Sequence, residues 1–231
     1  MRLTVASYNV HGCIGGDSRF DPERTLGVLR ELDADVIALQ ELRWSPEEAL
    51  HLLADFGDRL GYAALAGPTL MRKDGHYGNA LLTRLGVCEL ARVDLSLPGR
   101  EPRGALDARL DAGGIALRVV ATHLGLRPGE RRAQMRRLLA LMRVRASTPQ
   151  LLLGDLNEWF LWGRPLRWLR RRFGRTPAPP SFPARWPLFA LDRIWVEPRG
   201  LLGKVRVHAS PRARAASDHL PVRAELHLPE L

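Results

Sequence analysis

A carboxylate, an amide or a histidine stands at the end of almost every apolar segment that we predict to be a core strand. Asn9 ends the first such segment, and Glu41 follows the second. His123 and Asp155 come directly after two later ones. Because strand ends converge at one rim of a sheet, we expect these side chains to share a cleft. Carboxylates, amides and histidines gathered in this way can bind a cation, contact a phosphate and transfer a proton.

The same arrangement continues toward the C-terminal end of the chain. Asn157 closes a Gly-Asp-Leu-Asn turn, Asp192 opens one late strand, and Asp218 and His219 open the last one. Each residue has an ordinary structural explanation when it is taken alone, because Asp and Asn cap backbone groups in turns. Their joint occurrence at strand ends favours a shared functional site.

Hairpins of short strands, together with three or four helices, predict two packed sheets flanked by helices. Asp21-Pro22-Glu23 predicts the start of a helix, and Ser45 with Glu48 has the spacing of a capping box. Apolar residues with helical spacing predict a further helix around residues 135–142. The predicted strands cover residues 3–9, 36–39, 80–83, 105–110, 115–122, 150–153, 193–196, 205–208 and 221–227.

Six short motifs, in a fixed order, span residues 7–221. They are Tyr8-Asn9-Val10-His11-Gly12, Leu39-Gln40-Glu41, Thr122-His123-Leu124, Gly154-Asp155-Leu156-Asn157, Leu191-Asp192-Arg193-Ile194 and Ser217-Asp218-His219-Leu220-Pro221. This set resembles the endonuclease/exonuclease/phosphatase superfamily. The resemblance implies an α/β fold, a four-layer α/β sandwich of two mostly antiparallel sheets flanked by helices. It also implies hydrolysis of phosphate esters with Mg²⁺ or Mn²⁺.

The metal ligands that we expect are Glu41, with Asn9 nearby and Asp218 opposite. A hard divalent cation prefers oxygen ligands and keeps several waters, which these side chains suit. The cation would bind a phosphate oxygen and neutralise the charge that develops in the transition state.

The resemblance also implies catalytic roles. Asp155 or Asp192 orients or deprotonates the attacking water, and Asn157 donates a hydrogen bond to the phosphoryl group. His219 contacts the scissile phosphate, either as general base or as an imidazolium, with Asp192 holding its ring. His123 binds a nonbridging oxygen. Histidine suits these roles because its pKa lies near neutrality.

Substrate contacts are carried by less specific signals. Arg100 or Arg103 matches the position of a phosphate-contacting arginine in the family, and we prefer Arg103, which is nearer the strand. His76 or Tyr77 matches another substrate contact, with a solvated loop as the alternative for both pairs. Residues 177–187, which contain Ser181-Phe182-Pro183, resemble the loop that precedes Asp192 in many members. The abasic-site endonuclease branch has tyrosine at the place of His123, so this histidine favours the deoxyribonuclease, sphingomyelinase and phosphatase branches.

Length and composition predict one globular domain over residues 1–231. Apolar residues make up 45% and charged residues 26%, and no run of eighteen apolar residues occurs, so a disordered or membrane-spanning chain is excluded. Two cysteines exclude a disulfide framework. The chain enters its first strand without a signal-peptide pattern, so we expect the cytoplasm.

Thirty-five basic and twenty-five acidic residues give a net charge of +10, which attracts polyanions and anionic membranes. Residues 159–173 interleave tryptophan with arginine. Such a segment can stack bases, lie on a membrane, or form a surface helix with Trp168 and Leu169 packed inward.

We therefore expect a monomeric, Mg²⁺- or Mn²⁺-dependent phosphodiesterase. Its substrate would be a nucleic acid or a phospholipid headgroup, with peripheral membrane contact as one option. A phosphomonoesterase of the inositol-phosphate kind is the enzymatic alternative, and it needs extra basic residues to hold a dianion. A catalytically silent phosphate-binding module is the alternative from a different class.

Overall fold

The computed structural model describes residues 1–44, 49–72, 75–143 and 148–229. Within these ranges eleven strands form two sheets, one in the order β10-β11-β1-β2-β4-β3 and one in the order β5-β6-β7-β8-β9. The strands are β1 (Arg2–Asn9), β2 (Val36–Trp44), β3 (Ala63–Arg72), β4 (Gly75–Thr83), β5 (Gly86–Asp94), β6 (Gly104–Ala112), β7 (Ile115–His123), β8 (Gln150–Asp155), β9 (Asp192–Glu197), β10 (Leu202–Val207) and β11 (Val222–His227). The helices are α1 (Pro22–Leu32), α2 (Ala49–Leu60), α3 (Pro128–Arg143), α4 (Arg164–Phe173) and α5 (Pro211–Ala216), with short 3-10 turns η1 (His11–Cys13) and η2 (Arg199–Leu201).

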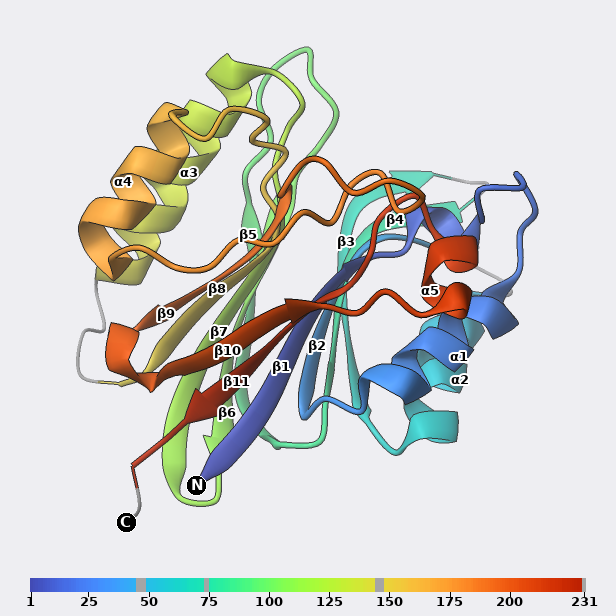
Figure 1. The fold of residues 1–231 in the computed structure, drawn as a ribbon, viewed down its shortest axis with the longest axis horizontal. Coiled ribbons are helices and arrows are strands. Elements are labelled where there is room, and N and C mark those ends of the chain that lie inside the picture. The colour runs from blue at the N-terminus through green and yellow to red at the C-terminus, as the bar shows by residue number, and fades with distance from the viewer. Residues whose placement is uncertain (45–48, 73–74, 144–147, 230–231) are drawn as a thin grey trace.

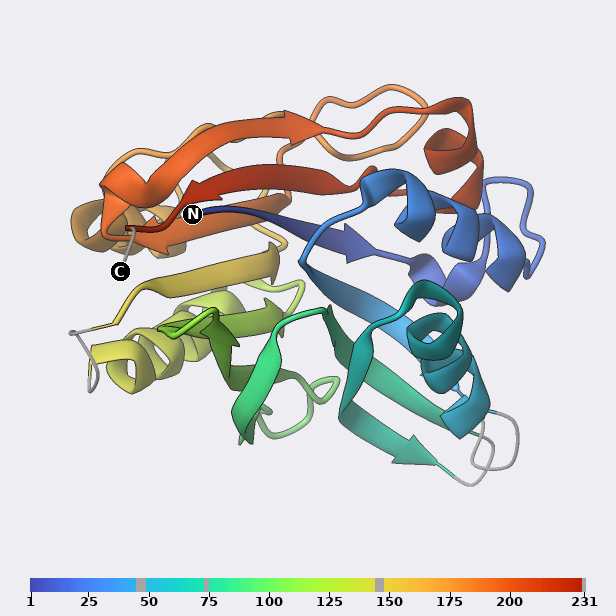
Figure 2. The same cartoon turned by 90° about the horizontal axis from the view of Figure 1, so that it is seen from below.

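The elements stack as four layers (Figures 1 and 2). Helices α1, α2 and α5 cover the outer face of the six-stranded sheet, and α3 and α4 cover the outer face of the five-stranded sheet. Three hydrophobic cores fill the spaces between the layers. In β8, alternation places Leu151 and Leu153 between the sheets and Leu152 under α3 and α4. The predicted four-layer sandwich is confirmed.

Helix α1 begins and ends where its sequence predicts. A side-chain oxygen of Asp21 accepts a hydrogen bond from the backbone N–H of Arg24 at 3.1 Å, and Pro22 occupies the first helical position. The chain leaves the helix at Asp33, in the left-handed conformation with φ 41°. The capping box predicted at residues 45–48 lies outside the described residues.

Two strands were not predicted, and both lie at sheet edges. β3 contains Pro68, and its register against β4 shifts just after that proline. β5 is exposed along almost its whole length, so it lacks the alternation of apolar and polar residues that identifies a half-buried strand.

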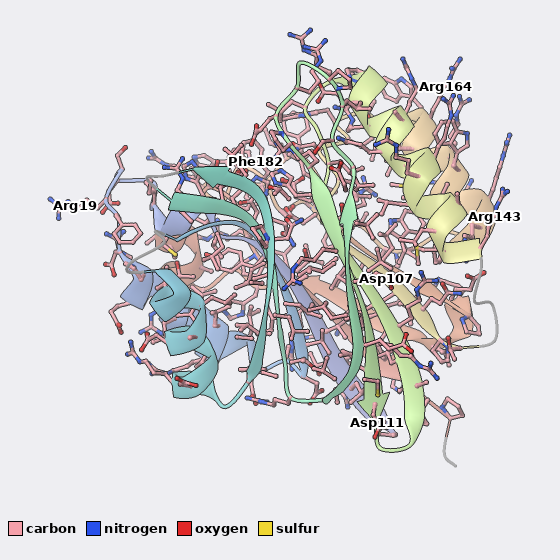
Figure 3. The ribbon with its side chains drawn as sticks, turned by 180° about the vertical axis from the view of Figure 1, so that it is seen from behind. Arg19, Asp107, Asp111, Arg143, Arg164 and Phe182 are labelled. Atoms are coloured by element: carbon pink, nitrogen blue, oxygen red, sulfur yellow. The ribbon has the colours of Figure 1, made fainter. Side chains whose placement is uncertain are left out.

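The strand register delivers the candidate residues to one edge of the sandwich. Each sheet has one parallel pair, β1 with β2 and β7 with β8, and the remaining pairs are antiparallel. His123 at the end of β7 lies opposite Asp155 at the end of β8, which in turn lies opposite Asp192. Figure 3 shows Phe182, beside this group, and Asp111, near the β6–β7 turn, at opposite edges of the molecule. None of the helices in the described part of the chain has the length and hydropathy of a membrane span.

Candidate active site

Side chains from both sheets meet around the buried carboxylate of Asp155. Its Oδ2 accepts a hydrogen bond from Asn9 Nδ2 at 3.1 Å. The same oxygen lies 3.6 Å from His123 Nε2 and 3.8 Å from His219 Nε2. Its Oδ1 accepts a hydrogen bond from the backbone N–H of Asn157 at 2.8 Å. Four predicted residues therefore surround one carboxylate.

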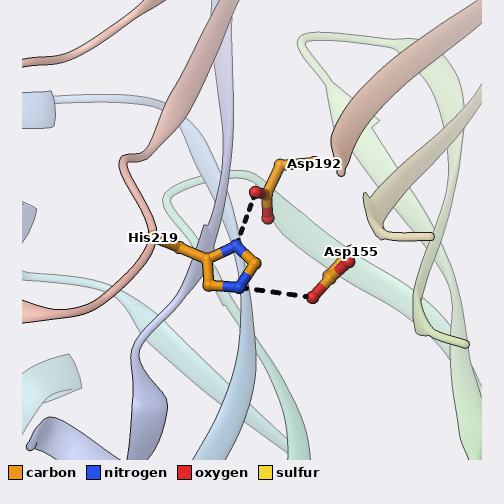
Figure 4. A group of neighbouring side chains, drawn as sticks. All are labelled: Asp155, Asp192 and His219. Atoms are coloured by element: carbon orange, nitrogen blue, oxygen red, sulfur yellow. Dashed lines mark hydrogen bonds and ion pairs between the residues drawn. The ribbon is translucent and has the colours of Figure 1, made fainter. Parts of the chain in front are cut away.

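The ring of His219 lies between two carboxylates (Figure 4). Nδ1 is 2.8 Å from Asp192 Oδ2, and Nε2 faces Asp155. Asp192 Oδ2 also accepts a hydrogen bond from Ser181 Oγ at 2.6 Å. The backbone N–H of His219 donates to Ser217 Oγ at 3.1 Å. A carboxylate bound to one ring nitrogen fixes the direction of the other, so Asp192 aims Nε2 at Asp155.

The charges of these three groups are linked. Burial opposes the imidazolium form of His219, but the carboxylates of Asp192 and Asp155 outweigh burial and raise its pKa to about 10. Burial raises the pKa of Asp155 to about 6; the positive charge of His219 opposes this shift and the negative charge of Asp192 adds to it. The arrangement thus holds a cation between two carboxylates, and the raised pKa of Asp155 suits it to exchange a proton near neutral pH.

A second group of side chains is built around His123. Asn157 Nδ2 lies 2.9 Å from His123 Nε2 and donates to the carbonyl of Leu124 at 3.0 Å. Arg103 Nη1 lies 3.3 Å from His123 Nδ1, and the guanidinium pairs with Glu101 at 3.1 Å. Burial, together with the positive charge of Arg103, holds the pKa of His123 well below its usual range. This histidine is therefore neutral and has a cation beside it.

Glu41 lies at a β-bulge, where the register of β2 against β4 shifts. Its φ of 58° is in the left-handed region, which is strained for a residue with a side chain and interrupts the alternation of the strand. Its Oε1 accepts a hydrogen bond from Asn9 Nδ2 at 3.0 Å and lies 3.8 Å from His123 Nε2. Tyr77 on β4 is half-buried, and burial and the negative charge of Glu41 raise its pKa.

Asp218 lies at the margin of this group. Its carboxylate is 40% exposed and lies 3.8 Å from His11 Nδ1. Ser217, its neighbour, donates to the backbone carbonyl of Asn9 at 2.7 Å and so holds this loop against β1. We expected Asp218 opposite Glu41 as a metal ligand, and this role stays a prediction.

The structure separates the two arginines that the sequence left open. Arg103 is buried at His123, whereas Arg100 pairs with Glu130 at 3.1 Å, at the start of α3. The side chain of His76, the alternative to Tyr77, lies outside the described ones.

The oxygen-rich end of the site fits a hard divalent cation. Asn9 Nδ2 donates hydrogen bonds to both Glu41 Oε1 and Asp155 Oδ2, so two carboxylate oxygens lie beside one amide group. The Glu41 side chain is partly exposed, which leaves space for the waters that Mg²⁺ retains. A second set of possible ligand atoms, all within 4.8 Å of one another, belongs to Asp155, Asp192 and His219. In that set Asp192 and His219 are hydrogen-bonded to each other, so those two atoms are already occupied. The donors therefore fit Mg²⁺ or Mn²⁺ better at Glu41.

Asn9 itself presents its amide nitrogen to the two carboxylates. Its oxygen accepts a hydrogen bond from the backbone N–H of His11 at 3.0 Å. In this arrangement Asn9 positions Glu41 and Asp155, and its predicted role as a ligand is untested.

Several supporting residues had no role assigned from the sequence. Ser181 contacts Asp192, Ser217 contacts Asn9, and Glu101 contacts Arg103. Ser181 lies in the loop before Asp192, and Ser217 opens the last of the six motifs, so their positions were the available signals. Glu101 gives no such signal in the sequence.

Comparison with known proteins identifies the family of this chain. Residues 6–219 match the Endonuclease/Exonuclease/phosphatase family. The Escherichia coli (strain K12) protein YbhP, which carries the name "Uncharacterized protein", is 32% identical over 250 residues that cover 97% of this chain and 96% of that one. An endonuclease/exonuclease/phosphatase from Beutenbergia cavernae DSM 12333 has a TM-score of 0.77 at 22% identity, covering 98% of this chain and 72% of that chain.

A second solved structure, D. rerio TDP2 complexed with a single-strand DNA product, has a TM-score of 0.74 at 18% identity and covers 98% of this chain and 99% of that chain. At these identities the two solved structures show a shared fold. The family match over nearly the whole chain and the strand-end cluster of acids, amides and histidines lead to one conclusion: this chain belongs to the endonuclease/exonuclease/phosphatase family.

Proposed function

We propose that the protein is a divalent-metal-dependent phosphodiesterase that activates a water for in-line attack on phosphorus. One observation carries this proposal. The buried carboxylate of Asp155 lies beside the imidazolium of His219 and the neutral ring of His123. Asn9 donates hydrogen bonds to Asp155 and to Glu41 and so links the two carboxylates. The group therefore combines a base, hydrogen-bond donors and oxygen ligands within one cluster.

Each residue has a role that follows from its contacts. Asp155, whose pKa of about 6 leaves it ionised at neutral pH, accepts the proton of the attacking water. Asp192 is fully buried and has Oδ2 occupied by His219 and Ser181, so it acts as a positioning residue. The imidazolium of His219 donates from Nε2 to a phosphoryl oxygen and stabilises negative charge there.

The remaining groups bind the phosphate. A nonbridging oxygen would replace the contact between Asn157 Nδ2 and His123 Nε2, which frees one N–H of Asn157 to donate to it, and Arg103, beside His123, supplies positive charge. A divalent cation held by Glu41 would polarise the phosphoryl group and neutralise the charge on the leaving oxygen. Glu101 pairs with Arg103 and offsets part of its charge, which favours a diester monoanion over a monoester dianion.

Hydrolysis of model esters tests this proposal. Bis(p-nitrophenyl) phosphate and p-nitrophenyl phosphate would be compared with Mg²⁺, Mn²⁺ or EDTA, for the wild type and His219→Ala. We expect metal-dependent hydrolysis of the diester that is lost in EDTA and in the variant. Preference for the monoester would favour a phosphatase, and Mg²⁺ binding without hydrolysis of either ester would favour a binding module.

A further inference from the structure

Exposed apolar side chains are concentrated in the loops beside the site. Of the eleven large hydrophobic side chains that are exposed in the described chain, eight belong to Leu126, residues 159–162 and residues 186–189. We call these eight residues the apolar rim. Trp162, Trp186 and Leu188 are the most exposed, at 72%, 71% and 71%. Folded monomers seldom expose contiguous apolar patches of this kind unless the patch binds something.

Buried polar contacts hold the first two parts of the rim together. Arg131 is buried and pairs with Glu158 at 3.2 Å, and it also donates to the backbone carbonyl of Leu126. Glu158 in turn accepts from the backbone N–H of Phe160 at 3.3 Å, and Gly163 N–H donates to the carbonyl of Phe160 at 2.8 Å. Hydrogen bonds and a buried ion pair therefore fix the conformation of this loop, and its apolar side chains point outward.

The third part of the rim is a short hairpin attached to the site. Phe182 and Phe189 form a β-bridge, and the backbone N–H of Trp186 donates to the carbonyl of Pro183 at 3.1 Å. Trp159 packs against Phe182 at 5.6 Å and against Phe189 at 5.0 Å between ring centroids. The ring of Phe182 lies 4.7 Å from that of His219. Ring contacts thus connect the rim to the candidate catalytic histidine.

Positive charge surrounds the rim. Arg127, Arg164 and Arg185 are exposed in the same loops or at the adjoining start of α4. The whole chain carries a net charge of +10. Tryptophan, phenylalanine and leucine at the tips of loops, with arginines beside them, match the interface of an anionic bilayer, which takes rings and aliphatic groups to a depth of about 5–10 Å.

We propose that the apolar rim docks the protein on an anionic phospholipid bilayer and so places the site against lipid headgroups. The inference rests on the proposed function for its substrate, the phosphodiester of a membrane phospholipid. Leu126, Leu161 and Leu188 favour a membrane over a single-stranded nucleic acid, because bases stack on flat rings and gain little from leucine. Trp168 does not belong to the rim, since it is half-buried with Arg136 over its ring at 5.2 Å.

Vesicle flotation tests the docking without reference to activity. The wild-type protein would be mixed, in EDTA, with vesicles of phosphatidylcholine alone or with about 30% phosphatidylglycerol, the anionic component. Trp162→Ser/Leu188→Ser is the test variant, because neither side chain is in the proposed catalytic machinery. Phe20→Ser is the matched control, since Phe20 is 62% exposed and adjoins Arg19, which Figure 3 shows far from Arg164.

We expect the wild type and Phe20→Ser to float with anionic vesicles, and the double variant to bind at least about tenfold more weakly, because two buried side chains are lost from the interface. Hydrolysis of bis(p-nitrophenyl) phosphate, a soluble ester, should be the same in all three proteins. Flotation with no hydrolysis of any phosphodiester would refute the proposed function and leave the docking intact.

Three results would overturn the docking. The wild type would fail to float with anionic vesicles, or the double variant would float as well as the wild type. Alternatively, the double variant would lose binding to a fluorescent single-stranded oligonucleotide or lose a dimer seen by sedimentation, while vesicle binding stayed unchanged. Either loss would assign the rim to a nucleic acid or to a second copy of the chain.

Discussion

Replacing Asp192 by asparagine tests how the site holds His219. Asparagine keeps the shape of the side chain and can still accept from His219 Nδ1 and Ser181 Oγ, but it removes the negative charge. A buried hydrogen bond between charged partners contributes about 1.5–3 kcal/mol, and a neutral one about 1 kcal/mol. Loss of the charge should therefore raise the activation free energy by up to about 2 kcal/mol, a fall in kcat of up to about thirtyfold.

The assay is the hydrolysis of bis(p-nitrophenyl) phosphate from pH 5 to 10 at saturating Mn²⁺. Asp192 raises the pKa of His219, so this pKa should fall in the variant. The alkaline limb of the pH profile should therefore shift to lower pH, with KM little changed. Glu31→Gln is the control, since Glu31 also lies 2.8 Å from a histidine, His208, but outside the site. Asp192→Asn with more than half of the wild-type kcat and an unchanged pH profile would refute this account.

Three further predictions address other parts of the molecule. Arg103→Ala should lower kcat/KM by about tenfold to a hundredfold, whereas Arg100→Ala, whose guanidinium pairs with Glu130, should retain it, and equal effects in steady-state kinetics would contradict the assignment. The pKa of His219 is raised to about 10 from 6.5, so protonation of this ring should stabilise the fold fully below about pH 6.5, and this stabilisation should be lost as the pH rises toward 10. The Tm of His219→Asn in EDTA should therefore lie below that of the wild type at pH 6.5, and the difference should shrink toward pH 10. A difference that stays constant over this range would disprove the prediction. Glu158→Ala should lower the free energy of unfolding by about 3–5 kcal/mol in urea titration, because it leaves Arg131 buried without its partner, and a loss below about 1 kcal/mol would show that the pair is not buried in solution.

The sequence predicted the frame of this molecule because its central strands carry strong local signals. β8 is buried on both faces and reads as a continuous apolar run, and the cap and proline of α1 are plain at Asp21 and Pro22. The edge strands β3 and β5 lacked such signals, since a proline interrupts one and solvent covers the other. These strands form through pairing with β4 and β6, which local sequence does not report.

The site divides in the same way. Asn9, His123, Asp155 and Asp192 were predictable because parallel and antiparallel pairing carries strand ends to one edge. The contact between Asp192 and the ring of His219 was expected, but the directions of most other side chains were not predictable, because they depend on partners far away in the chain. Ser181 on Asp192, Arg103 on His123 and the left-handed backbone at Glu41 are all tertiary features.

The measurement that tests the central claim most directly is the metal dependence of phosphodiester hydrolysis for the wild type and Glu41→Ala. Initial rates on bis(p-nitrophenyl) phosphate would be recorded across a Mn²⁺ titration after removal of metal with EDTA. The account predicts a saturable rate for the wild type, no activity without metal, and a requirement for at least about tenfold more Mn²⁺ in Glu41→Ala, since a charged oxygen ligand is lost. Full activity of the metal-free protein, or the same Mn²⁺ dependence in both proteins, would contradict it.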